Sequence, residues 1–229
     1  MRFFTWRTFH KTKWSISTVK AHAIRNEFID MKNIMGKTDV HIVDGGANVG
    51  LFTKCLKMYL PDSTIYSFEP QEHLNLKEKL KGFQDVHVIT AALGDKDKKV
   101  DFFISIDDRE SQSSSLIKTD KKKAKKITVP MVTLDNWVKE NKIKKIDILK
   151  LDLEGYDLKA LEGAKKLLSN SVKIVFVEIQ FIDLRKGQPS FCDYVEFLKN
   201  YGFEFFNFYG LSTRKDGHVT GGNALFMKN

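Results

Sequence analysis

The sequence has little cysteine and no long apolar run. Its 229 residues include two cysteines, Cys55 and Cys192, which lack the Cys-x-x-Cys spacing of a metal or redox site. Two are also too few for a disulfide framework, so we expect a protein of the reducing cytosol. Since no stretch of about 18 consecutive apolar residues occurs, no segment is predicted to span a membrane.

Acidic residues are missing from positions 1–26, where basic and aromatic residues are mixed. The segment also lacks the continuous apolar stretch of a secretory signal. Such a mixture suits the surface of an anionic membrane, and it equally suits a lead-in segment that packs on a domain. The expected location is therefore the cytoplasm, with peripheral contact to a membrane surface as an open alternative.

The net charge of +9 is concentrated in a few places. Besides the N-terminal segment, the main source is the lysine run DKKKAKK at 120–126, which we expect to lie in water at the tip of a hairpin. The basic and aromatic residues do not follow the pattern of an RRM, a KH domain or a zinc finger. No nucleic-acid partner is expected.

The sequence does contain short apolar runs that alternate with amphipathic stretches, the pattern of a parallel sheet built from βαβ units. Helices are predicted to begin near Val49, Gln71, Tyr156 and Pro189. Residues 1–39 form an N-terminal extension with a lead-in helix in this interpretation, and residues 40–229 form one domain. The predicted strands are 40–44, 64–68, 86–91, 146–151 and 172–179.

Two antiparallel pairs interrupt this order. Residues 99–105 and 127–134 are predicted to form an inserted β-hairpin that extends one edge of the sheet or caps the site. Residues 203–208 and 223–227 are predicted to pair at the end of the chain, across a glycine-rich polar loop. A mostly parallel sheet with a C-terminal antiparallel strand is typical of class I methyltransferases, so we expect their Rossmann-like three-layer α/β sandwich.

A glycine-rich turn, in the segment HIVDGGANVG, follows the first predicted strand. Ligands of open α/β sheets bind at the carboxyl ends of strands, where this turn lies. We expect Gly46 and Gly50 to let the backbone approach a cofactor closely and Asn48 to adopt a left-handed conformation. Gly45 and Asn48 are counted with them among the predicted cofactor-binding residues. Asp44, next to Gly45, is predicted to order the turn and to meet the amino-acid part of the cofactor.

A carboxylate ends the second predicted strand, 19 residues beyond the last glycine of that turn. Glu69 is predicted to accept hydrogen bonds from both hydroxyls of an adenosine ribose, which fits S-adenosylmethionine and also NAD. Two features favour S-adenosylmethionine. The turn has the form D-x-G-x-N-x-G, without the first glycine of the fingerprint G-x-G-x-x-G, and only one βαβαβ half precedes the insertion.

Charges alternate along the fourth predicted strand. Lys150, Asp152 and Glu154 are expected to share one face, beside the cofactor. Asp152 is the predicted catalytic residue, as the base that takes a hydroxyl proton or as the ligand of a divalent cation that acidifies the hydroxyl. Lys150 is predicted to stabilise the developing oxyanion or to keep Asp152 ionised. Structural roles stay open: a Lys–Asp pair that closes the strand, and Glu154 in the first turn of a helix.

Further residues near the predicted site have two interpretations each. Glu178, which ends the fifth predicted strand, would form an oxygen-only Mg²⁺ site together with Asp152, although two acids alone do not define one. The histidines, including His73 and His218, show no ligand spacing and are predicted to lie at the surface. A C-terminal group of aromatic residues forms core or stacks on sugar faces. These residues are Tyr201, Phe205, Phe206, Phe208 and Tyr209.

Together these stretches resemble the FkbM family of S-adenosylmethionine-dependent methyltransferases. Where the family usually has DVGAN, this chain has Gly45 at the second position. The matching pieces cover most of residues 40–180, in the expected order. They are IVDGGANVG at 42–50, YSFEP at 66–70, VITAALGD at 88–95, SSSL at 113–116, VTLDNW at 132–137, IDILKLDLEGYDLKALEGA at 146–164 and VFVEIQ at 175–180.

The resemblance implies an O-methyltransferase that acts on a hydroxyl of a sugar, a glycolipid or a related small molecule. It implies acceptor specificity within residues 1–39 and 185–222. By position it carries cofactor contacts onto Asp44, Gly46, Gly50 and Glu69, and acceptor chemistry onto Lys150, Asp152 and Glu154.

Two other functions stay open. An NAD-dependent oxidoreductase would need a hydride-relay acid pair, and no candidate pair stands out in the sequence. A non-catalytic cofactor-binding module would carry a damaged site, whereas the glycine turn, Glu69 and Asp152 are all intact. The sequence leaves the acceptor, the metal dependence and the oligomeric state undetermined.

Overall fold

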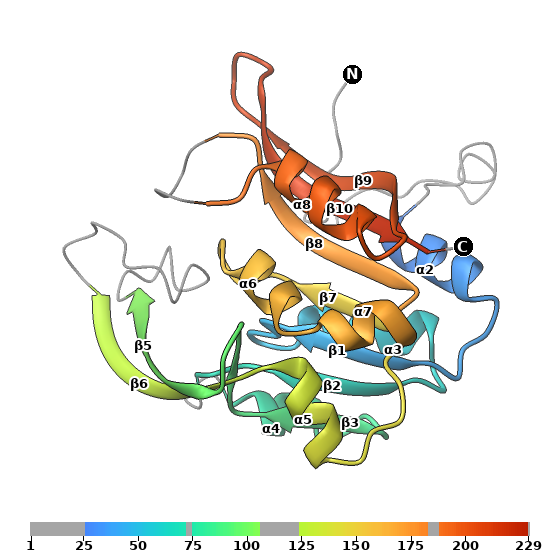
Figure 1. Ribbon diagram of the computed structural model, residues 1–229, viewed down its shortest axis with the longest axis vertical. Helices are drawn as coiled ribbons and strands as arrows, with labels where there is room; N and C mark the ends of the chain where they lie inside the picture. The colour runs from blue at the N-terminus through green and yellow to red at the C-terminus, as the bar shows by residue number, and fades with distance from the viewer. Residues whose placement is uncertain (1–25, 72–74, 106–123, 183–187, 229) are drawn as a thin grey trace, which may run out of the picture.

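A seven-stranded sheet forms the centre of the computed structural model, which describes residues 26–71, 75–105, 124–182 and 188–228 (Figure 1). The strand order is β3-β2-β1-β7-β8-β10-β9. Strands β3 to β8 in this order run parallel, whereas β10 is antiparallel to both of its neighbours. The strands are β1 (His41–Gly45), β2 (Thr64–Phe68), β3 (Val86–Ile89), β7 (Ile148–Leu151), β8 (Ile174–Gln180), β9 (Glu204–Thr213) and β10 (Val219–Met227).

Helices cover both faces of this sheet, which gives the predicted three-layer sandwich (Figure 1). Helices α2 (Glu27–Met35) and α3 (Leu51–Tyr59) pack on one face, and α4 (Leu76–Leu80) lies beside the start of α3. The other face is covered by α5 (Leu134–Glu140), α6 (Asp157–Glu162), α7 (Lys165–Asn170) and α8 (Phe191–Lys199). Among the described residues, no helix is long and apolar enough to cross a membrane.

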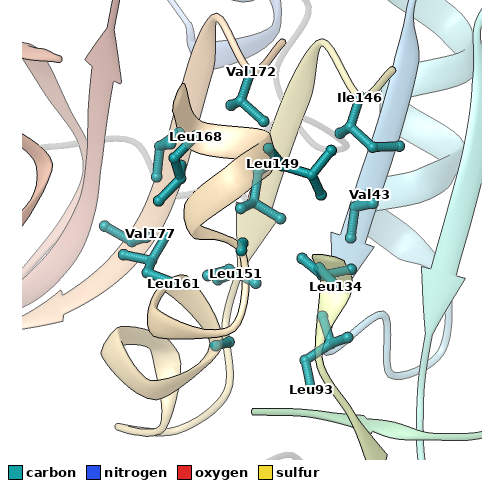
Figure 2. Packing of buried hydrophobic residues seen from close by; sticks show 14 of the residues in the cluster. Val43, Leu93, Leu134, Ile146, Leu149, Leu151, Leu161, Leu168, Val172 and Val177 are labelled. Atoms are coloured by element: carbon teal, nitrogen blue, oxygen red, sulfur yellow. The ribbon is translucent and has the colours of Figure 1, made fainter. Parts of the chain in front are cut away.

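The main core lies between the second helical layer and the sheet. Figure 2 shows Leu161 of α6 and Leu168 of α7 beside Leu149 and Leu151 of β7 and Val177 of β8. All five side chains are fully buried. Because β7 is covered on both faces, its four residues are all buried, as is usual for a central parallel strand.

The insertion forms a sheet of its own rather than extending an edge of the main sheet. Strands β5 (Lys98–Ser105) and β6 (Ala124–Val132) pair antiparallel, as predicted, and β4 (Ala92–Leu93) joins β6 in parallel. The predicted third strand is therefore too long: β3 ends at Ile89 because the chain then leaves it to pair with β6. Residues 106–123, with part of the lysine run, lie outside the described residues.

The C-terminal strands pair antiparallel as predicted, but they are longer than expected. Gly221 and Gly222, assigned to a loop by the sequence, lie within β10. Both serve close packing inside the sheet: a Cβ on Gly221 would crowd Gln180 of β8, and a Cβ on Gly222 would crowd Leu211 of β9. Glycine marks close strand contact here, not a turn.

Helix α2 is tied to the far end of the chain. The hydroxyl of Tyr209 in β9 donates a 2.6 Å hydrogen bond to Oδ2 of the buried Asp30. Phe28 and Met31 pack into the core on the α3 face. The basic and aromatic segment before this helix, residues 1–25, lies outside the described residues, so the predicted membrane contact stays a prediction.

Candidate active site

The glycine turn between β1 and α3 has three left-handed residues. Gly46 has φ 73°, Asn48 φ 50° and Gly50 φ 80°, so the predicted conformation of Asn48 is confirmed. The backbone N–H of Gly46 donates to the carbonyl of Phe68 at 3.0 Å. A Cβ on Gly46 would overlap the carbonyl oxygen of Asp152, so the turn lies directly against the segment that follows β7.

The other two glycines of the turn make room for protein atoms. A Cβ on Gly45 would lie 2.9 Å from side-chain atoms of both Leu93 and Leu151. A Cβ on Gly50 would lie 2.9 Å from two leucine side chains of α4. Both glycines are buried, and neither lines the two hollows described below. The expectation that Gly50 lets the backbone approach a cofactor is therefore not supported by its position.

A buried ion pair lies behind the turn. The Nζ of Lys150 is 2.9 Å from Oδ1 of Asp44, and it donates to the carbonyls of Gly45 at 3.1 Å and Gly46 at 3.0 Å. Burial opposes the positive charge, but the carboxylates of Asp44 and Asp152 outweigh it and keep the pKa of Lys150 above its ordinary value. This ammonium group fastens β7 to the end of β1.

These contacts bear on two predicted roles. The Lys150 ammonium donates two hydrogen bonds to backbone carbonyls and forms an ion pair with Asp44, and its side chain is 5% exposed, so protein groups take up most of its capacity to bind a substrate oxyanion. Asp44 is 0% exposed, and its Oδ2 accepts a 2.6 Å hydrogen bond from Thr53. The geometry thus favours positioning roles for both residues over direct contact with substrate or cofactor.

Glu69 connects the turn to the end of β2. Its Oε2 accepts from the N–H of Asn48 at 2.9 Å, and its Oε1 accepts from the N–H of Gln71 at 3.0 Å. Burial raises the pKa of Glu69 above its ordinary value even though these N–H groups stabilise the charge. The side chain of Gln71 also hydrogen-bonds the carboxylate, which leaves lone-pair capacity for a ligand hydroxyl.

The charged residues after β7 do not continue the strand. Because β7 ends at Leu151, the predicted alternation stops there: Lys150 is buried, whereas the Asp152 side chain is 43% exposed. Glu154 has φ 55° and lies in a turn, since α6 begins only at Asp157. The alternative placement of Glu154 in the first turn of a helix is therefore wrong.

Two adjoining hollows lie around this edge of the sheet, with cavity volumes of about 70 and 360 Å³. The second volume falls within the range of small-molecule sites. Gly46, Asn48 and Asp152 line both. The first is further lined by Phe68, Glu69, Pro70, Gln71, Ala91, Ala92, Leu93, Phe102, Leu153 and Glu154, and the second by Glu27, Phe28, Ala47, Val49, Leu51, Phe52, Cys55, Lys150, Phe176 and Asn223.

Two residues of this region were not predicted from the sequence. Phe102 reaches the first hollow from the inserted β5, a placement that depends on how the second sheet folds back. Asp157 is 1% exposed and accepts hydrogen bonds from the N–H groups of Leu153 and Gly155. Burial, followed by the charge of Asp152, raises the pKa of Asp157 to about 7. The available signal was an aspartate two residues after a glycine, at the start of a predicted helix.

The predicted metal site finds no further ligand. The described residues contain no group of three or more His, Cys, Asp or Glu side chains that could hold an ion. Glu178 accepts a 3.1 Å hydrogen bond from Gln180 on its own strand. A cation held by Asp152 and Glu178 stays a prediction.

The remaining predictions concern histidines and aromatic residues. His218 lies at the surface as predicted, with its side chain 71% exposed, whereas His73 lies outside the described residues. Tyr209 is buried, in line with the interpretation of the C-terminal aromatics as core, whereas Phe205 is 40% exposed within a cluster of phenylalanine rings.

Comparison with known families identifies the chain. The Methyltransferase FkbM domain matches residues 44–205, which span the glycine turn, Glu69, Asp152 and α8. The chain belongs to the FkbM methyltransferase family. Membership of this family argues against the NAD-dependent oxidoreductase. No curated protein matches the sequence.

Solved structures with the same fold include another FkbM methyltransferase. The methyltransferase FkbM from Methylobacillus flagellatus KT superposes with a TM-score of 0.54 at 14% identity, over 83% of this FkbM chain and 44% of that one. An rRNA methylase from Streptococcus thermophilus superposes with a TM-score of 0.51 at 16% identity, over 90% and 98% of the two chains. At these identities the likeness establishes the class I methyltransferase fold.

Proposed function

We propose that this FkbM methyltransferase transfers a methyl group from S-adenosylmethionine to a hydroxyl oxygen of a sugar, a glycolipid or a related small molecule. The observation that carries the proposal is the first hollow, where Glu69 and the glycine turn meet the exposed carboxylate of Asp152. Nucleoside recognition and a proton acceptor thus lie at one edge of one sheet.

The described residues fit the proposed cofactor. The carboxylate of Glu69 suits a ribose hydroxyl, and the missing Cβ of Gly46 leaves the turn pressed against the segment after β7. Lys150 and Asp44 keep the turn in place from behind. Asn48 lines the hollow with a left-handed backbone and an N–H that orients Glu69.

Methyl transfer to a hydroxyl requires the protein to align the two reactants and to supply a base. When bound, S-adenosylmethionine supplies a methyl group on a sulfonium ion, which departs as a neutral thioether. Asp152 is positioned to accept the proton that the acceptor hydroxyl loses, which contributes about 10² to 10⁴ in rate. Alignment of the two reactants within the hollows supplies up to about 7 to 11 kcal/mol.

The second hollow supports an acceptor site beside the base. It shares Asp152 with the first hollow, and it is lined by the rings of Phe28, Phe52 and Phe176. Phe52 lies 5.5 Å from Phe176 and 4.9 Å from Phe28, between ring centroids. An aromatic wall suits the C–H face of a sugar or the apolar part of a glycolipid.

The test is the fate of the methyl group. S-adenosylmethionine labelled in its methyl group is incubated with the protein and a panel of neutral monosaccharides and glycolipids, and the products are analysed by mass spectrometry. We expect label in a base-stable methyl ether, and a rate about 10² to 10⁴ lower for Asp152→Asn. Glu162→Gln, at a half-buried acid on α6 that lines neither hollow, is the matched control and should keep the wild-type rate.

Two results would contradict the proposal. Label on nitrogen, or in a base-labile ester, would assign a different acceptor atom. An undiminished rate in Asp152→Asn would remove Asp152 from the reaction.

A further inference from the structure

The turn between β7 and α6, residues 152–155, has an unusual backbone. Glu154 has φ 55° and Gly155 has φ 93°. Left-handed backbone is natural for glycine, but it costs about 1 to 2 kcal/mol for a residue with a side chain such as Glu154. An element that holds this turn would offset that cost.

Asp157 is that element. Its Oδ1 accepts from the N–H of Leu153 at 2.9 Å, and its Oδ2 accepts from the N–H of Gly155 at 3.2 Å. The two oxygens of one carboxylate thus hold the backbone on both sides of Glu154. The side chain is 1% exposed, so water does not compete for these N–H groups.

The turn held by Asp157 forms one wall of the first hollow. Asp152, Leu153 and Glu154 all line it, and the carbonyl oxygen of Asp152 lies against Gly46 of the glycine turn. A shift of the turn would move both the carboxylate of Asp152 and the space available to a ligand.

We propose that Asp157 is a positioning residue, whose ionised carboxylate holds the turn 152–155 in the shape that binds S-adenosylmethionine. This inference rests on the proposed function. Protonation turns one carboxylate oxygen into a hydroxyl, which is a much weaker acceptor, so the hydrogen bond on one side of Glu154 is weakened and that side of the turn is loosened.

The charges around Asp157 make this change accessible at moderate pH. Three titratable groups interact with Asp157: Asp152 in the same turn, Lys150 in β7 and the Tyr194 hydroxyl in α8. The charges of Glu178 and Asp193 also raise the pKa of Tyr194. Burial and the charge of Asp152 raise the pKa of Asp157 to about 7, against the opposing effect of the backbone N–H groups. The turn should therefore be held at pH 8 and largely released at pH 6.

The first experiment titrates the protein with S-adenosylhomocysteine by calorimetry at pH 6, 7 and 8. If about a tenth of the molecules are ionised at pH 6, the apparent affinity of the wild type falls about tenfold between pH 8 and pH 6. Asp157→Asn should bind about tenfold more weakly at pH 8 and show no such pH dependence. Asp157→Glu, which keeps the charge, should recover part of the affinity at pH 8.

Asp135 provides a matched control. Its carboxylate also accepts two backbone hydrogen bonds, from Lys166 at 2.9 Å and Leu167 at 3.0 Å, but it joins α5 to α7 and lines neither hollow. Asp135→Asn should keep the wild-type affinity and its pH dependence. An Asp157→Asn variant with wild-type affinity and wild-type pH dependence would overturn the proposal.

A second experiment needs no ligand. The amide resonances of Leu153 and Gly155, followed by NMR between pH 5.5 and 8.5, should shift together with a midpoint near 7 in the wild type and stay constant in Asp157→Asn. Amides that do not titrate would overturn the role of Asp157 by themselves. A wild type that titrates in this way but binds no S-adenosylhomocysteine would instead contradict the proposed function.

Discussion

Lys150 is the residue on which the glycine turn depends most. Its ammonium group is 2.9 Å from Asp44, and both side chains are shielded from solvent. Removal of one partner of a buried ion pair leaves an uncompensated charge, which typically costs about 3 to 5 kcal/mol. We therefore expect Lys150→Met to lower the free energy of unfolding by about that amount in urea denaturation.

An exposed lysine on α6 is the control for this prediction. Lys159 contacts Glu162 at 2.7 Å, but its side chain is 48% exposed, so Lys159→Met should cost less than about 1 kcal/mol. Equal costs for the two variants would show that the Lys150–Asp44 pair does not stabilise the turn.

The raised pKa of Asp157 predicts that the stability of the protein depends on pH. Its carboxyl group has a pKa of about 7 in the folded protein and of about 3.9 in an unfolded chain. Between these values the native state keeps a proton that the unfolded chain has lost, so stability falls as the pH rises. The contribution of this group, up to about 4 kcal/mol, is present below about pH 4 and lost through pH 7.

Urea denaturation between pH 5 and pH 8 measures this contribution. The free energy of unfolding of Asp157→Asn should change less with pH than that of the wild type, because asparagine does not ionise. The carboxylate proposed to shape the site would then be one that costs stability at neutral pH, as is common for functional groups. Parallel pH profiles for the wild type and the variant would contradict the assignment.

Single residues differ in how far the sequence reveals them. Glu69 could be predicted because it directly follows β2, and Asn48 because it lies in the turn after β1; the end of a parallel strand fixes where such residues lie. The buried partners of Lys150 and Asp157 could not be predicted. The roles of both residues depend on these partners, and the carbonyl of Gly45 that Lys150 reaches is 105 positions away in the sequence.

The glycine turn is the element whose geometry can be tested most directly. Gly46→Ala introduces a Cβ that overlaps the carbonyl of Asp152, at a position with φ 73°. We expect loss of S-adenosylhomocysteine binding in calorimetry and a clear loss of stability in urea. Gly217 provides a control that separates backbone strain from steric overlap. It also has a left-handed backbone, with φ 88°, but a Cβ added there would have nothing within 4 Å.

Gly217→Ala should therefore cost only the intrinsic strain of about 1 to 2 kcal/mol and leave ligand binding unchanged. If Gly46→Ala bound S-adenosylhomocysteine like the wild type, close approach of the turn to the segment after β7 would not be required.

The type of each strand could be predicted from the sequence better than its first and last residues. Apolar runs located all five parallel strands, most clearly β1, β7 and β8, which are central strands buried on both faces. Gly221 and Gly222 were predicted to lie in a loop, although the structure has them in β10. These glycines are required because β8 and β9 pack closely against them. Such tertiary contacts cannot be recognised from the neighbouring residues in the sequence.

At the scale of the whole molecule, the strand order assembles the site. It places β1 between β2 and β7, so the turn after β1, Glu69 after β2 and Asp152 after β7 meet at one edge although they are far apart in the sequence (Figure 1). This convergence follows from the βαβ pattern. The separate sheet of the insertion, which brings Phe102 to the first hollow, does not, because it depends on the pairing of β4 with β6.

The most direct test of the account is a calorimetric titration of the protein with S-adenosylmethionine, S-adenosylhomocysteine and NADH. We predict that the two sulfur nucleotides bind and NADH does not, and that Glu69→Gln weakens binding about 10- to 100-fold through loss of charge-assisted hydrogen bonds. Glu78→Gln, an exposed acid on α4, should bind like the wild type. Binding of NADH in their place, or equal affinity in Glu69→Gln, would contradict the account.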